Sequence, residues 1–91
     1  MVVLLVRSVP RGLRGELTRW LLEPRAGVFV GDVSALVRDK LWEKVCAECK
    51  EGEAILAHNT DNEQGFALRF WHVQDKEVVD YEGLWLIRTV A

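Results

Sequence analysis

Near its N-terminus the chain carries an unbroken run of five apolar residues, VVLLV at 2–6. A short run of this kind, with no alternating polar residues, is typical of a central β-strand that is covered on both faces. The chain has 91 residues, which is enough for one domain with one hydrophobic core. We therefore expect a single domain, residues 1–91, built around this strand.

Two amphipathic patterns follow the apolar run, and each predicts a helix. The first helix runs from about residue 11 to Glu23, because Pro24 drives its predecessor out of the helical region. The second begins after a cap that either Asp32 or Ser34 can supply, and it runs to about residue 50.

Short apolar or alternating segments predict the other strands, at 28–30, 53–59, 66–73 and 84–90. The segment 25–34 must serve as one bent strand or as two very short ones, and 74–83 reads as a polar connection. This order fits an α+β fold of the ferredoxin-like plan, a small antiparallel sheet with two helices on one face.

The charge of the chain is unevenly distributed. Hydrophobic residues make up 49% and charged residues 29%, a composition that excludes disorder, and the net charge is −2. Residues 1–25 nevertheless hold five arginines against two glutamates, whereas the remaining residues hold seven basic against twelve acidic side chains. The positive field is local, and a ligand meets the local field.

Three of these arginines, Arg7, Arg11 and Arg14, gather around the start of the first predicted helix. A helix N-terminus already carries partial positive charge, so cations there disfavour the isolated protein by up to about 1 kcal/mol each. An external anion reverses the sign of this effect, because the backbone N–H groups and the arginines then act together. The alternative is that the arginines are solvated surface residues, some of them paired with Glu16 or Glu23.

Acidic and thiol side chains offer candidates for metal chemistry. Asp80 and Glu82 share one face of an extended segment and could hold a divalent cation, or they are solvent-facing flanks of the last strand. Cys46 and Cys49 are spaced by three on the second helix, so they are either packed thiols or a metal or redox pair.

No segment approaches the roughly 18 consecutive apolar residues of a membrane span. The opening MVVLLVRSVP has no basic region ahead of its apolar part and no small-residue cleavage site, so it is not a signal peptide. These features predict a cytoplasmic protein without a membrane partner.

A long segment carries a family resemblance. Residues 9–45, VPRGLRGELTRWLLEPRAGVFVGDVSALVRDKLWEKV, are similar to the small CRISPR-associated adaptation proteins of the Cas-two family in their subtype I-E form. The family pattern has Val-Pro, Leu-Arg-Gly, Trp-Leu-Leu-Glu and Arg-Ala-Gly-Val-aromatic-Val-Gly-Asp-Val-Ser, all of which stand here in order. The segment VDYEGL at 79–84 extends the match over nearly the whole chain.

The resemblance implies a ferredoxin-like fold, a homodimer and a role in acquiring new CRISPR spacers. In that family the dimer lies between two dimers of the Cas-one integrase, which performs the chemistry, while a double-stranded DNA lies across the assembly. The small protein is then a spacer and a positively charged platform for the DNA backbone. Backbone contacts carry no sequence information, which suits a protein that must accept any invading DNA.

The family's DNA-binding arginines correspond to Arg14 and Arg25 in this chain, and Lys76 remains from a basic pair before the last strand. Together with Arg7 and Arg11 they form the predicted nucleic-acid-binding set. The resemblance further implies that the C-terminal strand and tail, residues 79–91, dock on the integrase and across the dimer. The residues predicted for this docking are Asp80, Glu82, Leu84 and Leu86.

Some members of the family are described as metal-dependent nucleases of RNA or DNA, and this is the alternative function. Their signature is an acidic residue at the end of the first strand, and here that position is Arg7, which has no lone pair to offer Mg²⁺. We therefore predict no catalytic residue and no cofactor, with Mg²⁺ required only if the nuclease alternative holds. A regulatory small-ligand domain of ferredoxin-like type is supported by fold analogy alone.

Overall fold

The computed structural model describes residues 1–49, 51–82 and 84–90, and at residues 80, 81 and 85 it describes the backbone alone. Helices and strands alternate at first, and a run of strands follows. The elements are β1 (Val2–Arg7), α1 (Arg11–Thr18), β2 (Leu22–Arg25), β3 (Val28–Gly31), α2 (Ala35–Glu48), β4 (Glu53–Asn59), β5 (Phe66–Trp71), β6 (Lys76–Tyr81) and β7 (Leu84–Thr89).

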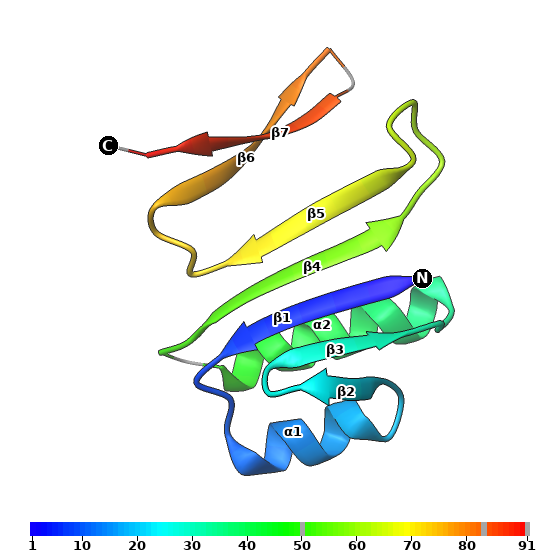
Figure 1. Ribbon diagram of the computed structural model, residues 1–91, viewed down its shortest axis with the longest axis vertical. Coiled ribbons are helices and arrows are strands. Elements are labelled where there is room, and N and C mark those ends of the chain that lie inside the picture. Colours follow the sequence, from blue (N-terminus) through cyan, green and yellow to red (C-terminus); the bar gives the residue numbers. More distant parts are fainter. Residues whose placement is uncertain (50, 83, 91) are drawn as a thin grey trace.

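Within the described residues, five strands form an antiparallel sheet in the order β2-β3-β1-β4-β5, and β6 pairs with β7 in a separate hairpin (Figure 1). The apolar run at 2–6 thus lies in β1, at the centre of the sheet, where β3 and β4 pair with it on either side. The predicted α+β class, with a small antiparallel sheet and two helices, is confirmed.

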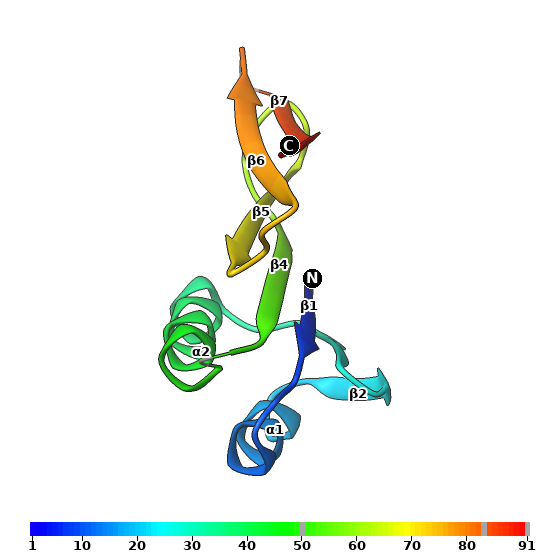
Figure 2. The same ribbon diagram turned by 90° about the vertical axis from the view of Figure 1, so that its left-hand side faces the viewer.

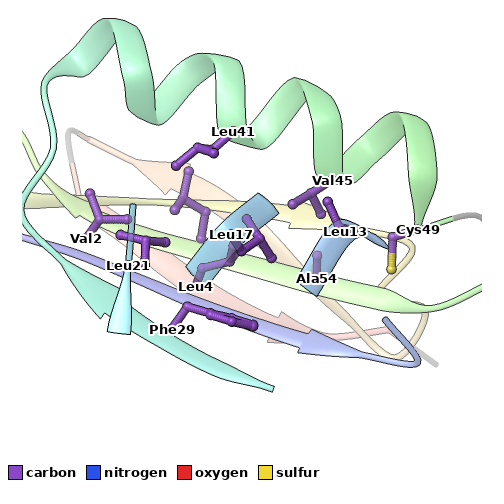
Figure 3. Packing of buried hydrophobic residues seen from close by; sticks show 11 residues of the cluster. Val2, Leu4, Leu13, Leu17, Leu21, Phe29, Leu41, Val45, Cys49 and Ala54 are labelled. Atoms are coloured by element: carbon purple, nitrogen blue, oxygen red, sulfur yellow. The ribbon is translucent and has the colours of Figure 1, made fainter. Parts of the chain in front are cut away.

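Both helices cover the same face of the sheet (Figure 2). Apolar side chains from α1, α2 and the covered face of the sheet meet in one buried cluster (Figure 3). Its members are Val2, Leu4, Leu13, Leu17, Leu21, Phe29, Leu41, Val45, Cys49, Ala54 and Leu56. This cluster is the hydrophobic core, and it fixes α1 against the β2–β3 side of the sheet and α2 against the β4 side.

The opposite face of the sheet has no covering layer in the described chain. Successive residues of a strand point to opposite faces, so Val3 and Leu5 lie on this side of β1 while Val2 and Leu4 enter the core. Leu5 is 40% exposed, in the centre of the sheet. We call this side the open face; its apolar residues are Val3, Leu5, Val28, Val30, Ile55, Ala57, Phe66, Leu68 and Phe70. We expected packed layers on both faces of β1, but in the described chain the helices cover one face only.

Helix α1 is shorter than predicted. It ends at Thr18 rather than near Glu23, and the chain turns through backbone hydrogen bonds from Trp20 and Leu21 to the carbonyl of Leu17. Leu22 is then free to pair with Val30 across the β2–β3 hairpin. The backbone N–H and C=O groups after Thr18 can be satisfied either by a further helical turn or by pairing with β3. In this chain the pairing with β3 takes the place of the last helical turn.

Two other segments differ from the sequence-based expectation. The connection at 74–83 contains β6, a strand whose charged residues gave no strand signal and which pairs with β7. In β5 the Phe66, Leu68 and Phe70 side chains belong to the open face, so Trp71 lies on the helix side and donates a hydrogen bond from Nε1 to the carbonyl of Cys49 at 3.0 Å. Trp71 thereby packs against the hydrophobic core.

Candidate nucleic-acid interface

One end of the sheet brings together the end of β1, the start of α1 and the turn between β2 and β3 (Figure 1). The backbone N–H of Val6 donates to the carbonyl of Gly27 at 2.8 Å and ties the turn to β1. Gly27 has φ +82°, and a Cβ there would lie 2.5 Å from the Val6 carbonyl oxygen, so only glycine allows this approach. Arg7, Arg11 and Arg25 thereby come to the same end of the molecule.

The first of these arginines, Arg7, belongs to the rim of the open face. It follows Val3 and Leu5 in strand alternation, and it stands opposite Glu53 of β4. Its Nη1 lies 3.5 Å from Glu53 Oε2, and its side chain is 80% exposed. A groove of about 650 Å³ beside it is also lined by Glu51, Glu53 and Asp75. The surroundings of Arg7 are thus more acidic than its sequence neighbours indicated.

Arg14, on α1, faces Glu23 of β2. Its Nε lies 3.4 Å from Glu23 Oε2, and the same oxygen accepts a hydrogen bond from the backbone N–H of Gly27 at 3.0 Å. Arg19 pairs with Glu16 at 3.7 Å. Pairing with Glu16 and Glu23, which the sequence left open as an alternative, therefore holds for Arg14 and Arg19.

Arg11 and Arg25 differ from these paired arginines. Both are exposed, and neither forms an ion pair with any residue whose side chain the structure describes. Arg11 is the first residue of α1, where Pro10 provides no side-chain cap and the first turn holds no acidic residue. The unpaired N–H groups of this turn and the guanidinium of Arg11 add their positive charge at the start of α1, and Arg25 contributes a second guanidinium without an ion pair among the described side chains.

Lys76, the fifth predicted nucleic-acid contact, lies at the start of β6. Its Nζ donates to Thr89 Oγ1 at 3.0 Å, which holds the ammonium against β7. The structure therefore places Lys76 on the hairpin, between Asp75 and Glu77 in sequence, and gives it a partner that the sequence did not indicate.

The residues predicted for partner docking lie on the β6–β7 hairpin. Leu84 and Leu86 lie on the same side of β7, and their side chains are 41% and 45% exposed. Glu82 is exposed in the turn between the strands, with φ +51°. The side chain of Asp80 lies outside the described residues. Within the described chain the hairpin pairs with no other strand, and it stands apart from the five-stranded sheet (Figure 1).

Metal and thiol chemistry has little structural support in the part of the chain that is described. No group of three or more His, Cys, Asp or Glu side chains gathers there in a way that could hold a metal ion. Cys49 is fully buried and its Sγ lies 3.7 Å from the carbonyl oxygen of Arg7, while burial raises the pKa of the Cys46 thiol. Both thiols are free.

Neither helix of the described residues is long and apolar enough to cross a membrane.

Comparison with protein families decides what kind of protein carries this arrangement. The family described as CRISPR-associated protein (Cas_Cas2CT1978) matches residues 1–86, nearly the whole chain. The chain belongs to this Cas-two family. The resemblance seen in residues 9–45 is thereby confirmed at the level of the family, and a role connected with CRISPR follows. The match includes β1, both helices and the positions of all five predicted nucleic-acid contacts.

The sequence missed the organising role of Glu23. It named this residue as the expected end of the first helix and as a possible ion-pair partner, whereas the folded chain places its carboxylate between α1 and the β2–β3 turn. The only available signal was the position of Glu23 four residues before Gly27, across a turn that the sequence did not place.

Proposed function

We propose that this Cas-two protein is a non-catalytic architectural subunit of CRISPR spacer acquisition, of subtype I-E, that bridges integrase dimers and binds the backbone of double-stranded DNA. The observation that carries the proposal is the uncompensated positive charge of Arg11 and Arg25 at one end of the sheet. Unpaired guanidinium groups next to unpaired backbone N–H groups form an environment that phosphate oxygens complement.

The proposal ranks the five predicted contacts by their surroundings. Arg11 and Arg25 are free to reach phosphates, and Arg14 keeps its Nη groups beyond the contact with Glu23. Further acidic residues, Glu51 and Asp75, line the groove beside Arg7, and Asp75 and Glu77 flank Lys76 in sequence, so the local potential at both sites is less favourable to phosphate. We therefore assign the principal phosphate contacts to Arg11, Arg14 and Arg25.

The open face supports the homodimer that forms part of this proposal. It exposes apolar side chains in the centre of a sheet, where a protein normally places a second layer. A second copy presents an identical apolar surface, so two copies can bury it in one isologous interface. The exposed leucines of the β6–β7 hairpin then remain available to the integrase, whose docking we assign to Glu82, Leu84, Leu86 and the backbone region around residue 80.

The test is the salt dependence of duplex binding. Fluorescence anisotropy with a labelled duplex of mixed sequence is measured for the wild type, Arg11→Ala and Arg25→Ala over a range of salt concentrations, with and without the integrase. Each phosphate contact that is lost reduces the magnitude of the negative slope of log K against log salt by about 0.9. Affinity should fall alike for all sequences, because backbone contacts are not sequence-specific.

Lys40→Ala is the matched control, because Lys40 is an exposed cation on α2 without an ion pair among the described residues. It should leave the slope near that of the wild type. If Arg11→Ala and Arg25→Ala give the same slope as Lys40→Ala, the assignment of the phosphate contacts fails.

A further inference from the structure

Glu23 makes two contacts with one carboxylate oxygen. Its Oε2 accepts a hydrogen bond from the N–H of Gly27 at 3.0 Å and lies 3.4 Å from Nε of Arg14. The Glu23 side chain is only 18% exposed, whereas that of Arg14 is 47% exposed. The carboxylate therefore lies beneath the guanidinium, between α1 and the β2–β3 turn.

The contact with Gly27 closes a short loop, residues 23–27, which contains Arg25. Gly27, at the end of this loop, is also held to β1 by the hydrogen bond from the N–H of Val6 to its carbonyl. The conformation of Gly27 is available only to glycine at this close approach to β1. Glu23 thus joins the helix that carries Arg14 to the turn that carries Arg25.

A carboxylate at this position weakens the electrostatic attraction of DNA phosphates. Next to arginines that contact DNA, a negative charge lowers the local positive potential and weakens the attraction of phosphate. A guanidinium has five N–H donors in a rigid fork, and the contact at Nε leaves the donors on both Nη atoms free. Holding Nε orients these outer donors and reduces the freedom that the side chain loses on binding.

We propose that Glu23 is a positioning residue for phosphate binding, which orients the guanidinium of Arg14 and the turn that bears Arg25. The inference rests on the proposed DNA-binding function and deepens it. The geometry that Glu23 imposes outweighs the repulsion between its charge and the phosphates.

Two substitutions separate geometry from charge. Glu23→Gln removes the charge, but its amide oxygen can take the place of Oε2, accept from the N–H of Gly27 and remain beside Nε of Arg14. Glu23→Ala removes the charge and both contacts. The long-range repulsion is relieved equally in the two variants, so a difference between them reports the positioning alone.

Duplex binding of the full-length chain is measured by anisotropy as a function of salt, with circular dichroism as a check of folding. Glu23→Gln should bind the duplex at least as tightly as the wild type, and Glu23→Ala should bind about three- to tenfold more weakly than Glu23→Gln. The slope of log K against log salt should be smaller in magnitude by about 0.9 for Glu23→Ala than for the wild type, because one phosphate contact is lost. In an Arg14→Ala background, Glu23→Ala should have little further effect, since the two residues act through one contact.

Equal or tighter binding by both variants would overturn the inference, because it would show that only the charge of Glu23 matters. Glu23→Asp serves if Glu23→Ala does not fold: it keeps the charge but withdraws the oxygen by one methylene. Positioning predicts that Glu23→Asp binds more weakly than the wild type, and an affinity equal to that of the wild type would contradict it. A wild-type chain that binds no duplex, with or without the integrase, overturns the proposed function and this inference together.

Discussion

At the scale of single residues, the surroundings of each arginine decide what it can bind. Arg7 and Arg14 face carboxylates of Glu53 and Glu23, whereas Arg11 and Arg25 have no such neighbour among the described side chains. Ion pairs at a protein surface contribute about 0–1 kcal/mol, so they do not prevent an arginine from binding a phosphate.

A second cluster of charges joins α2 to the sheet. Asp39 Oδ1 lies 3.0 Å from Nε of Arg38 and 2.9 Å from Nη2 of Arg69 on β5. The hydrogen bond from Arg38 lowers the pKa of the Asp39 carboxyl, Arg69 adds to this effect, and desolvation opposes it. The ionised carboxylate is therefore favoured in the folded state.

This shift predicts how stability depends on pH. Because the folded-state pKa of Asp39 is depressed, its contribution is fully present above the ordinary carboxyl pKa of about 4 and is lost as the pH falls through the lower, folded value. The wild type should be more stable than Asp39→Asn at neutral pH, by about 1 kcal/mol or less for so exposed a pair. Urea unfolding at a series of pH values measures the difference, which should shrink below about pH 4. A difference that stays constant down to acid unfolding would contradict the assignment.

At the scale of elements, the two helices begin in different ways. Helix α2 has a side-chain cap, since Ser34 Oγ accepts from the N–H of Val37 at 3.2 Å. Helix α1 follows Pro10 and has no side-chain cap. The first turn of α2 is thus satisfied within the protein, whereas the first turn of α1 leaves N–H groups available to an external anion.

The cap of α2 gives a prediction about stability. Ser34→Ala removes the acceptor of the Val37 N–H and should lower the free energy of unfolding by about 1 kcal/mol. Ser34→Asp, which keeps an acceptor at the same place, should retain most of the stability. Thermal or urea unfolding of the two variants measures both effects. Equal losses in the two variants would show that the hydroxyl does not act as a cap.

At the scale of the whole molecule, the main question is what covers the open face. The sequence of the central strand β1 predicts burial on both faces of the sheet, yet the helices cover only one face. The remaining apolar surface lies over β3, β1, β4 and β5, and grooves of about 250 Å³ and 240 Å³ hollow it around Leu5 and Val3. A second copy of the chain is the partner that we propose for this surface.

A charge in the centre of the open face should therefore prevent dimerisation. Leu5→Glu places an unpaired carboxylate in the proposed interface, which is strongly unfavourable, so the chain should become monomeric. The matched control is Leu36→Glu, because Leu36 is an exposed leucine at the start of α2, on the helix side. Light scattering coupled to size exclusion measures the mass of each variant. A dimer that survives Leu5→Glu, or one that Leu36→Glu disrupts instead, would place the interface elsewhere.

Local patterns were sufficient to predict much of this protein. The apolar run of β1, the helical periodicity of α2 and the β4–β5 hairpin all follow from residues close together in the chain, because the physics that forms them is local. The sequence left the cap of α2 open between Asp32 and Ser34, and the structure shows that Ser34 supplies it. The order of motifs in residues 9–45 likewise indicated the Cas-two family.

Other features depended on the tertiary structure, because they arise where distant segments meet. Only the folded chain pairs Arg7 with Glu53, places Glu23 between Arg14 and Gly27, and ends α1 early so that β2 can pair with β3. The strand β6 likewise forms by pairing with β7, since its own residues do not predict a strand. The sequence by itself thus determined the fold class, β1, α2, the β4–β5 hairpin and the arginines that could bind an anion, but not β2, β6 or the end of α1. Which of those arginines are free, and which face of the sheet is uncovered, was decided by the tertiary structure, because ion pairs and burial depend on distances that only folding sets.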